Sequence, residues 1–170
     1  MKNIILTGLM GSGKTSVSCY LSKIFPDFKL IETDSLIVKK EGVSINEIFE
    51  TKGENYFRKI ERDLICSILE SESQIISLGG GSLENNFDFA LAKKNSLIFY
   101  LKASIETLYE RIKNSNDRPL LKCDNPKAKL KELLDIREKN YLKADYIIDV
   151  NNIDIETTAK KIEELYKNEN

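Results

Sequence analysis

The sequence contains no histidine among its 170 residues. That absence excludes general base catalysis by histidine, Ser-His-Asp triads and metal sites with histidine ligands. The three cysteines (Cys19, Cys66 and Cys123) lie far apart and form no C-x-x-C pair, so a zinc ribbon or a thioredoxin-like centre is unsupported. We expect Cys19 and Cys66 to be buried because they lie in apolar-periodic segments, and the odd cysteine count indicates a reducing compartment.

The sequence also lacks long apolar runs and an excess of charge of either sign. No stretch of about 18 apolar residues occurs, and the N-terminal MKNIILTG lacks the length and the cleavage site of a signal peptide. The 26 basic and 27 acidic residues give a formal net charge of -1, which argues against binding to nucleic acid or to a membrane surface through bulk electrostatics. We therefore expect a cytoplasmic protein that folds as one domain over residues 1–170.

Short apolar runs alternate with longer helical patterns along the chain. The runs are continuous, as in strands buried on both faces, and cover residues 3–6, 28–31, 74–78, 96–101 and 145–148. Apolar residues at helical spacing predict helices over residues 53–71, 104–113, 126–143 and 154–167, and Ser44 with Glu47 forms a capping box that opens a shorter helix. This alternation predicts an α/β fold with a mostly parallel sheet and helices on both faces.

Residues 8–15 (GLMGSGKT) match the phosphate-loop pattern G-x-x-x-x-G-K-[ST] between a predicted strand and a predicted helix. Gly8, Gly11 and Gly13 permit positive φ angles, so that successive backbone N–H groups can face one concavity. The helix that starts near Gly13 adds its positive dipole end. Lys14 is suited to the β and γ phosphates, and the Thr15 hydroxyl is suited to Mg²⁺. We predict binding of a nucleoside triphosphate; the alternative is a glycine-rich turn with a chance lysine.

Nucleotide binding leaves three classes open: a small-molecule kinase, a GTPase switch and an ATP-driven mechanical domain. The N-K-x-D motif with which GTPases commonly read the base is absent, and mechanical ATPases are commonly larger. Residues 114–125 (NSNDRPLLKCDN) form a polar segment that carries Arg118, and a connection of this length is commonly a functional lid or a disordered excursion. A chain of this size with a mobile lid fits a small-molecule kinase.

Polar residues follow two of the predicted strands, at the end of the sheet where open α/β folds bind ligands. Glu32 and Asp34 come after the second run, where one carboxylate can hold a metal through water and the other can accept a proton from a hydroxyl group. The alternative for Asp34 is the N-cap of a helix over residues 35–40. Three glycines, residues 79–81, follow the third run and suit a backbone that approaches a ligand closely; the alternative is a flexible turn.

Two arginines on predicted helices suit an acidic substrate. Arg58 can meet Glu61 on one helix face, so a surface ion pair is the alternative for it. Arg137, with Tyr141 four residues further on, has the same ambiguity. Arginine is preferred over lysine where a carboxylate is held by two parallel hydrogen bonds, so two arginines that face the crevice favour a small acidic substrate.

These elements together resemble the shikimate kinase family. The matching segments are GLMGSGKT at residues 8–15, Asp34, GENYFRKIE at 53–61, SLGGGS at 77–82, RIKNSNDRPLL at 111–121 and REKNYLKAD at 137–145. The resemblance implies a three-layer P-loop fold with five parallel strands in the order 2-3-1-4-5 and a mobile lid. It also implies transfer of the γ-phosphoryl group of ATP to the 3-hydroxyl of shikimate with Mg²⁺. The product is shikimate 3-phosphate, on the route to chorismate and the aromatic amino acids.

The resemblance assigns roles to individual residues. Those implied on the ATP side are Gly11, Ser12, Gly13, Lys14, Thr15, Ser16, Arg111 and Arg118. Those implied on the shikimate side are Asp34, Arg58, Gly79, Gly80, Gly81 and Arg137. Asp34 is the implied catalytic base, Lys14 and Arg118 are implied to act on the phosphates, and Thr15 is the implied Mg²⁺ ligand. Arg58 and Arg137 are implied to hold the shikimate carboxylate, and Arg111 to flank the adenine.

One position departs from the family pattern, because Glu32 stands where the family commonly has aspartate. Glutamate is longer by one methylene but still accepts hydrogen bonds from a metal-bound water. The nearest alternatives are another small kinase of the same fold, for gluconate or a nucleotide, and a nucleotide-dependent regulatory module without catalysis. The resemblance further implies a monomer whose partners are ATP and shikimate.

Overall fold

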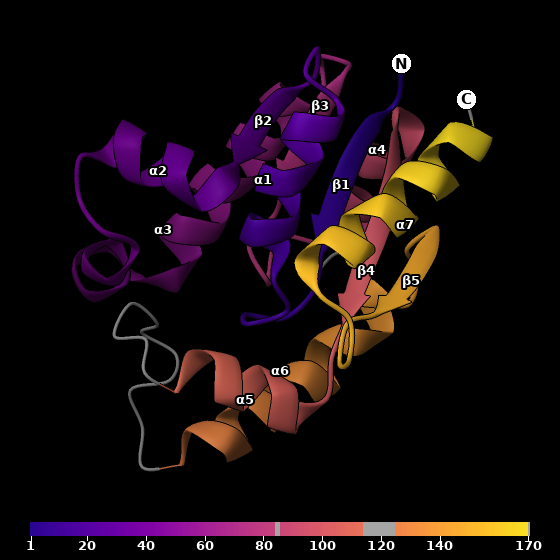
Figure 1. The fold of residues 1–170 in the computed structure, drawn as a ribbon. Helices are drawn as coiled ribbons and strands as arrows, with labels where there is room; N and C mark the ends of the chain where they lie inside the picture. Colours follow the sequence, from indigo (N-terminus) through magenta and orange to yellow (C-terminus); the bar gives the residue numbers. More distant parts are fainter. Residues whose placement is uncertain (84–85, 114–124, 170) are drawn as a thin grey trace.

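A computed structural model of the chain describes residues 1–83, 86–113 and 125–169, and it contains a five-stranded parallel sheet (Figure 1). The strands are β1 (Asn3–Thr7), β2 (Lys29–Glu32), β3 (Gln74–Ser77), β4 (Ser96–Lys102) and β5 (Tyr146–Asp149). Their order, β2-β3-β1-β4-β5, confirms the expected one. Every neighbouring pair is parallel, so the carboxyl ends of all five strands lie along the same edge of the sheet.

Helices connect the strands and begin largely where the sequence predicts. They are α1 (Lys14–Ile24), α2 (Thr33–Glu41), α3 (Ile45–Ile68), α4 (Asn86–Lys94), α5 (Ile105–Ile112), α6 (Pro126–Tyr141) and α7 (Ile155–Asn168). The Ser44 hydroxyl accepts a hydrogen bond from the Glu47 N–H, which confirms the capping box. Gly53, with φ 80° and ψ 167°, breaks α3 at the residue where the longer predicted helix begins. The sequence did not predict α4.

The core lies on the two faces of the sheet, in the three layers that the sequence predicts (Figure 1). On one face Ile4 and Phe99 belong to a cluster that includes residues of α1 and α7. On the other face Ile5 and Ile98 pack with residues from the C-terminal half of α3 and from α4. Neighbouring residues of a strand thus enter different clusters, because strand side chains alternate between the two faces.

The edge strands are less buried than the continuous apolar runs predict. Leu30 of β2 is 36% exposed and Ile147 of β5 is 47% exposed. An edge strand is covered less completely than a central one, and local sequence does not reveal which strands end up at the edge. Double-sided burial therefore holds for β1, β3 and most of β4, but not for β2 and β5.

The expectation of buried thiols is wrong. Cys19 is exposed and Cys66 is half-buried, and both are free cysteines. In α1 the residues that face the core are Val17, Ser18 and Leu21, which turns Cys19 outward. Cys123 lies outside the described residues.

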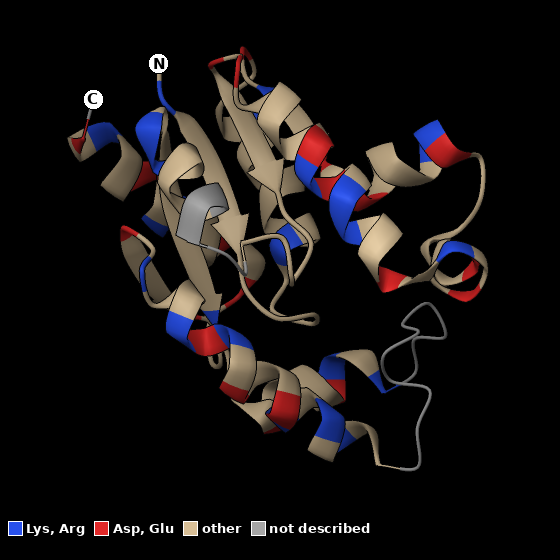
Figure 2. Cartoon of the chain, turned by 180° about the vertical axis from the view of Figure 1, so that it is seen from behind, with Lys and Arg blue, Asp and Glu red and all other residues tan. Residues whose placement is uncertain are grey.

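Charged residues of both signs are spread along the helices, while the sheet carries few (Figure 2). Within the described part of the chain, no helix is long and apolar enough to cross a membrane.

Candidate active site

A cavity of about 1100 Å³ opens at the carboxyl ends of the strands. Its lining includes residues 10–17 after β1, Glu32 at the end of β2 with Asp34 and Ser35 just after it, and residues 77–80 around the end of β3. Arg111 of α5 and residues between β5 and the start of α7 also line it. A space of this size exceeds the usual range for a single small ligand, and it has room for a nucleotide together with a second small molecule.

The loop between β1 and α1 has the backbone of a phosphate-binding loop. Gly8, Gly11 and Gly13 have φ angles of 140°, 83° and 93°, which confirms the positive φ angles expected there. The N-cap residue of α1 is Gly13, which has no side chain to bond the N–H groups of the first turn, and this turn lines the cavity. The buried Ser12 hydroxyl also has no hydrogen-bond partner among the described residues. A buried polar group of this kind is suited to a ligand atom.

Lys14 and Arg111 place positive charge on either side of this loop. The Lys14 Nζ donates to the carbonyl oxygens of Gly8 at 2.8 Å and Leu9 at 3.1 Å, so the ammonium group lies at the mouth of the loop. From α5, Arg111 donates to the Val150 carbonyl at 2.8 Å and to the Gly11 carbonyl at 3.4 Å. The guanidinium thus bridges the loop and the end of β5, and both cations line the cavity.

Thr15, Glu32 and Asp34 line the same cavity, and oxygen donors of these types suit Mg²⁺. Among the residues described, no cluster of three or more acidic, cysteine or histidine side chains could enclose a metal. Glu32 also accepts a hydrogen bond from the Ser35 hydroxyl at 3.1 Å.

Asp34 is not a helix N-cap. Helix α2 begins at Thr33 and has Glu32 at its N-cap position, which puts Asp34 in the first turn. The strand ends at Glu32 and the helix follows at once, so Glu32 and Asp34 do not lie together on an extended segment. Asp34 instead faces the glycines after β3: a methyl group on Gly79 would lie 2.9 Å from the Asp34 Oδ1.

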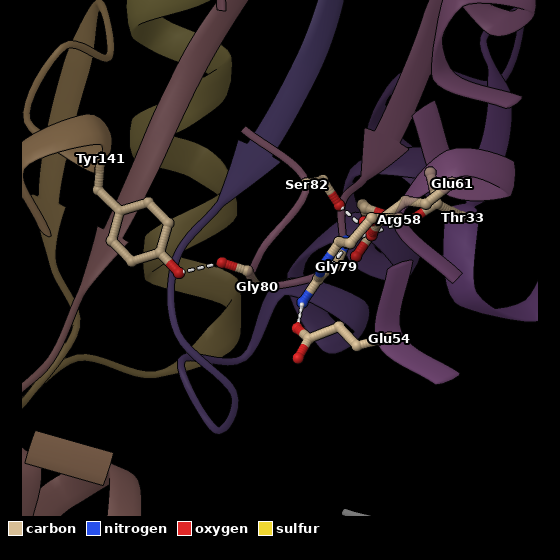
Figure 3. Close-up of polar contacts among 9 residues, drawn as sticks. Thr33, Glu54, Arg58, Glu61, Gly79, Gly80, Ser82 and Tyr141 are labelled. Atoms are coloured by element: carbon tan, nitrogen blue, oxygen red, sulfur yellow. Dashed lines mark hydrogen bonds and ion pairs between the residues drawn. The ribbon is translucent and has the colours of Figure 1, made fainter. Parts of the chain in front are cut away.

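A buried ion pair supports the other side of these glycines (Figure 3). The Glu61 side chain is 3% exposed, pairs with Arg58 at 2.7 Å and accepts a hydrogen bond from the Ser82 hydroxyl at 2.5 Å. Burial raises the pKa of the Glu61 carboxyl, against the opposing effect of the Arg58 charge. Arg58 also pairs with the exposed Glu54 at 3.2 Å. The pair between Arg58 and Glu61 was predicted only as the alternative to a binding role for Arg58, and as a surface pair; in the structure Glu61 is buried and Arg58 is 25% exposed.

Arg137 and Tyr141 of α6 approach the glycines from the opposite direction. Both side chains are buried, with 4% and 2% exposure. The Tyr141 hydroxyl donates a hydrogen bond to the Gly80 carbonyl (Figure 3). A methyl group on Gly80 would lie 3.5 Å from Arg137 Nη1, and one on Gly81 would lie 2.5 Å from Arg58 Nη2. The two guanidinium groups therefore flank the peptide between Gly80 and Gly81.

The structure brings most of the predicted residues to one cavity, though not all of them to its walls. The predicted residues that line it are Gly11, Ser12, Gly13, Lys14, Thr15, Ser16, Glu32, Asp34, Gly79, Gly80 and Arg111. Arg58, Gly81 and Arg137 are not among the lining residues, but both arginines lie against the glycine segment that forms part of the wall. Arg118 and residues 114–124 of the predicted lid lie outside the described residues.

The sequence missed three groups that the structure places at the site. Ser82 and Tyr141 join the site through hydrogen bonds to Glu61 and Gly80, which are distant in sequence, and no local sequence pattern predicts such contacts. The cavity wall between Val150 and Thr158 was also missed. Its one signal is its position after the last strand, at the end of the sheet where ligands bind.

Known proteins match this chain over nearly its full length. The sequence model of the shikimate kinase family matches residues 10–167. A shikimate kinase of Caldanaerobacter subterraneus subsp. tengcongensis is 40% identical over 166 residues, which cover 98% of this chain and 96% of that protein. A shikimate kinase of Sulfurihydrogenibium sp. is 42% identical over 165 residues, which cover 97% and 96%.

A solved structure agrees with these relatives. The shikimate kinase from Acinetobacter baumannii in complex with shikimate superposes with a TM-score of 0.94 at 31% sequence identity, over 99% of this chain and 94% of that one. The fold, the phosphate loop and the full-length likeness lead to one conclusion: the chain belongs to the shikimate kinase family.

Proposed function

We propose that this enzyme transfers the γ-phosphoryl group of ATP to the 3-hydroxyl of shikimate, which yields shikimate 3-phosphate and ADP for the synthesis of aromatic amino acids. The observation that carries the proposal is the juxtaposition at the glycines after β3. A carboxylate, Asp34, and two guanidinium groups, of Arg58 and Arg137, lie around these glycines, beside a phosphate loop. This set suits a small acceptor that has both a hydroxyl group to be activated and a carboxylate to be held.

On the nucleotide side, the backbone does most of the binding. The N–H groups between Gly11 and Ser16 and the dipole of α1 hold the phosphates. Lys14 exchanges its carbonyl partners for the β and γ phosphates when ATP enters. Arg111 lies across the loop and flanks the adenine.

Mg²⁺ fits the oxygen donors at the cavity, where the Thr15 hydroxyl would ligate it and Glu32 would hold one of its waters. When bound, Mg²⁺ neutralises the charge that develops on the phosphate oxygens during transfer.

On the acceptor side, Asp34 orients the 3-hydroxyl of shikimate and accepts its proton as the oxygen attacks the γ-phosphorus. Arg58 and Arg137 hold the shikimate carboxylate by charge-assisted hydrogen bonds, and the glycine segment lets the substrate approach the backbone closely. Arg118 lies outside the described residues; its implied role is to stabilise the charge on the transferring group, where loss of such a donor commonly costs about 10²-fold in rate or more.

Release of ADP with a panel of acceptors tests the proposal. Shikimate should stimulate release, whereas gluconate and nucleoside monophosphates should not. Asp34→Asn should lower kcat by about 10²-fold or more while ATP binding is retained, because the amide cannot accept the proton. An absence of stimulation by shikimate, or full activity in Asp34→Asn, would overturn the proposal.

The proposal also covers the compartment and the oligomeric state of the enzyme. The free thiols of Cys19 and Cys66 fit a reducing compartment, and we place the enzyme in the cytoplasm. We further propose that it acts as a monomer, which light scattering of the purified protein at assay concentration would test.

A further inference from the structure

We propose that Tyr141 is a positioning residue that fixes the direction of the peptide between Gly80 and Gly81, and thereby the affinity for the carboxylate of the acceptor. The inference rests on the proposed function, because it assumes that an acceptor carboxylate binds between Arg58 and Arg137. Tyr141 is 2% exposed, and its hydroxyl donates to the Gly80 carbonyl.

The glycine peptide needs such a restraint because glycine turns its peptide units more readily than other residues do. Both ends of the segment are held: the Gly79 N–H donates to the Thr33 hydroxyl at 3.1 Å, and the Ser82 N–H donates to the Gly79 carbonyl at 3.2 Å. Between these two points, the hydrogen bond from Tyr141 is the one that the described structure shows at the 80–81 peptide.

The direction of this peptide decides which charge faces an anion. The described chain has no cis peptide bond, so the Gly80 carbonyl and the Gly81 N–H point in opposite directions. With its carbonyl turned to Tyr141, the peptide directs its N–H away from α6, toward the side of Arg58 (Figure 3). An N–H group attracts a carboxylate held between the two arginines, whereas a carbonyl oxygen in the same place would repel it.

Tyr141 is itself rigidly held, which makes it suited to this task. Its ring packs on that of Tyr100, with centroids 5.0 Å apart, and both rings belong to the cluster of buried residues on that side of the sheet. Arg137 lies one helical turn earlier on α6. One helix thus supplies a cation for the carboxylate and the hydroxyl that orients the neighbouring peptide.

Tyr141→Phe in the full-length enzyme tests the inference, because it removes the hydroxyl and keeps the packed ring. The loss of one neutral hydrogen bond should lower kcat/KM for shikimate about fivefold to tenfold. The change should be carried by KM for shikimate, with kcat and KM for ATP within about twofold of the wild type.

Tyr166→Phe is the matched control. Tyr166 is also buried, at 3%, and its hydroxyl also donates to a backbone carbonyl, that of Lys2 at 2.6 Å, just before β1 and thus at the end of that strand opposite the cavity. It should lose a comparable amount of thermal stability with no change in KM for shikimate. If both variants raise KM equally, Tyr141 acts only through general stability and the inference is wrong.

The methyl ester of shikimate tests whether the effect depends on the charge of the carboxylate, because the ester group is neutral. Tyr141→Phe should lower kcat/KM for the acid but change that for the ester by less than about twofold. Equal losses for acid and ester, or a loss confined to kcat, would contradict the inference. The wild-type enzyme is assayed with shikimate first, and an absence of turnover refutes the proposed function. If the wild type turns over shikimate and Tyr141→Phe has no effect, only this inference is refuted.

Discussion

Replacement of Gly79 by alanine should destabilise the protein and slow its turnover, although the backbone there would accept alanine. The φ angle of Gly79 is not among the positive ones, so no backbone strain is expected. The neighbours are the obstacle: a methyl group would lie 2.7 Å from Glu61 Oε1, 2.9 Å from Asp34 Oδ1 and 3.1 Å from Ser82 Oγ. Ordinary contact begins at 3.4 Å, so all three atoms would have to move.

The size of the effect follows from how firmly these atoms are held. Glu61 accepts a hydrogen bond from the Ser82 hydroxyl at 2.5 Å and forms an ion pair with Arg58 at 2.7 Å, so a shift of its carboxylate would weaken both interactions. Overpacking of such a site commonly costs about 1–3 kcal/mol. Asp34 would have to move by about 0.5 Å, the difference between 3.4 Å and 2.9 Å. Since misplacement of a reacting group by about 1 Å can cost about 10²-fold in rate, we expect kcat to fall about tenfold.

Gly80→Ala is the matched control for stability, because a methyl group there would meet its first neighbour, Arg137 Nη1, at 3.5 Å. Its free energy of unfolding should lie within about 1 kcal/mol of the wild type. Urea unfolding followed by circular dichroism measures both variants, and ADP release measures kcat of Gly79→Ala. A loss of stability in Gly80→Ala that equals or exceeds that in Gly79→Ala would refute the steric reasoning.

Three further predictions concern the same cavity. Burial raises the pKa of Glu61 from its ordinary 4.5 despite the charge of Arg58, so this group contributes stability that is present below pH 4.5 and is lost as pH rises through the raised pKa. Thermal midpoints should therefore fall with rising pH in the wild type relative to Glu61→Gln, and a constant difference from pH 4 to pH 8 would contradict this. Glu32→Asp should keep most turnover and shift mainly the Mg²⁺ dependence, which a collapse of kcat at saturating Mg²⁺ would disprove. Gly11→Ala should weaken ATP binding at least about tenfold, because φ is 83° there and the methyl group would lie 2.8 Å from Ile112 Cγ2; an unchanged ATP titration would count against it.

The features that were predictable from sequence depend on short stretches of chain. The phosphate loop is an example: the pattern of glycines in residues 8–15 dictates the positive φ angles, and the lysine follows at a fixed spacing. The starts of α3, α5 and α7 were also predictable. In each, the side chain of the N-cap residue (Ser44, Ser104 or Asp154) accepts a hydrogen bond from the N–H three residues further on.

The features that were not predictable depend on which elements become neighbours. The burial of Glu61 arises only when α3 packs beside the loop after β3, so its role could not be read from the helix alone. Helix α4 has only nine residues, Asn86–Lys94, which is too short a span for a helical period to stand out. Cys19 shows the converse error, since an apolar residue in a helix does not by itself reveal which side of that helix faces the core.

The two ends of the chain lie close together, away from the catalytic edge of the sheet (Figure 1). The Tyr166 hydroxyl reaches the Lys2 carbonyl at 2.6 Å, so the last helix is fastened to the start of the first strand. An affinity tag, a fluorescent fusion or a surface attachment at either terminus would therefore project away from the substrates. The same proximity makes the chain a candidate for circular permutation, with a short linker between the old ends and new ends placed at another exposed connection.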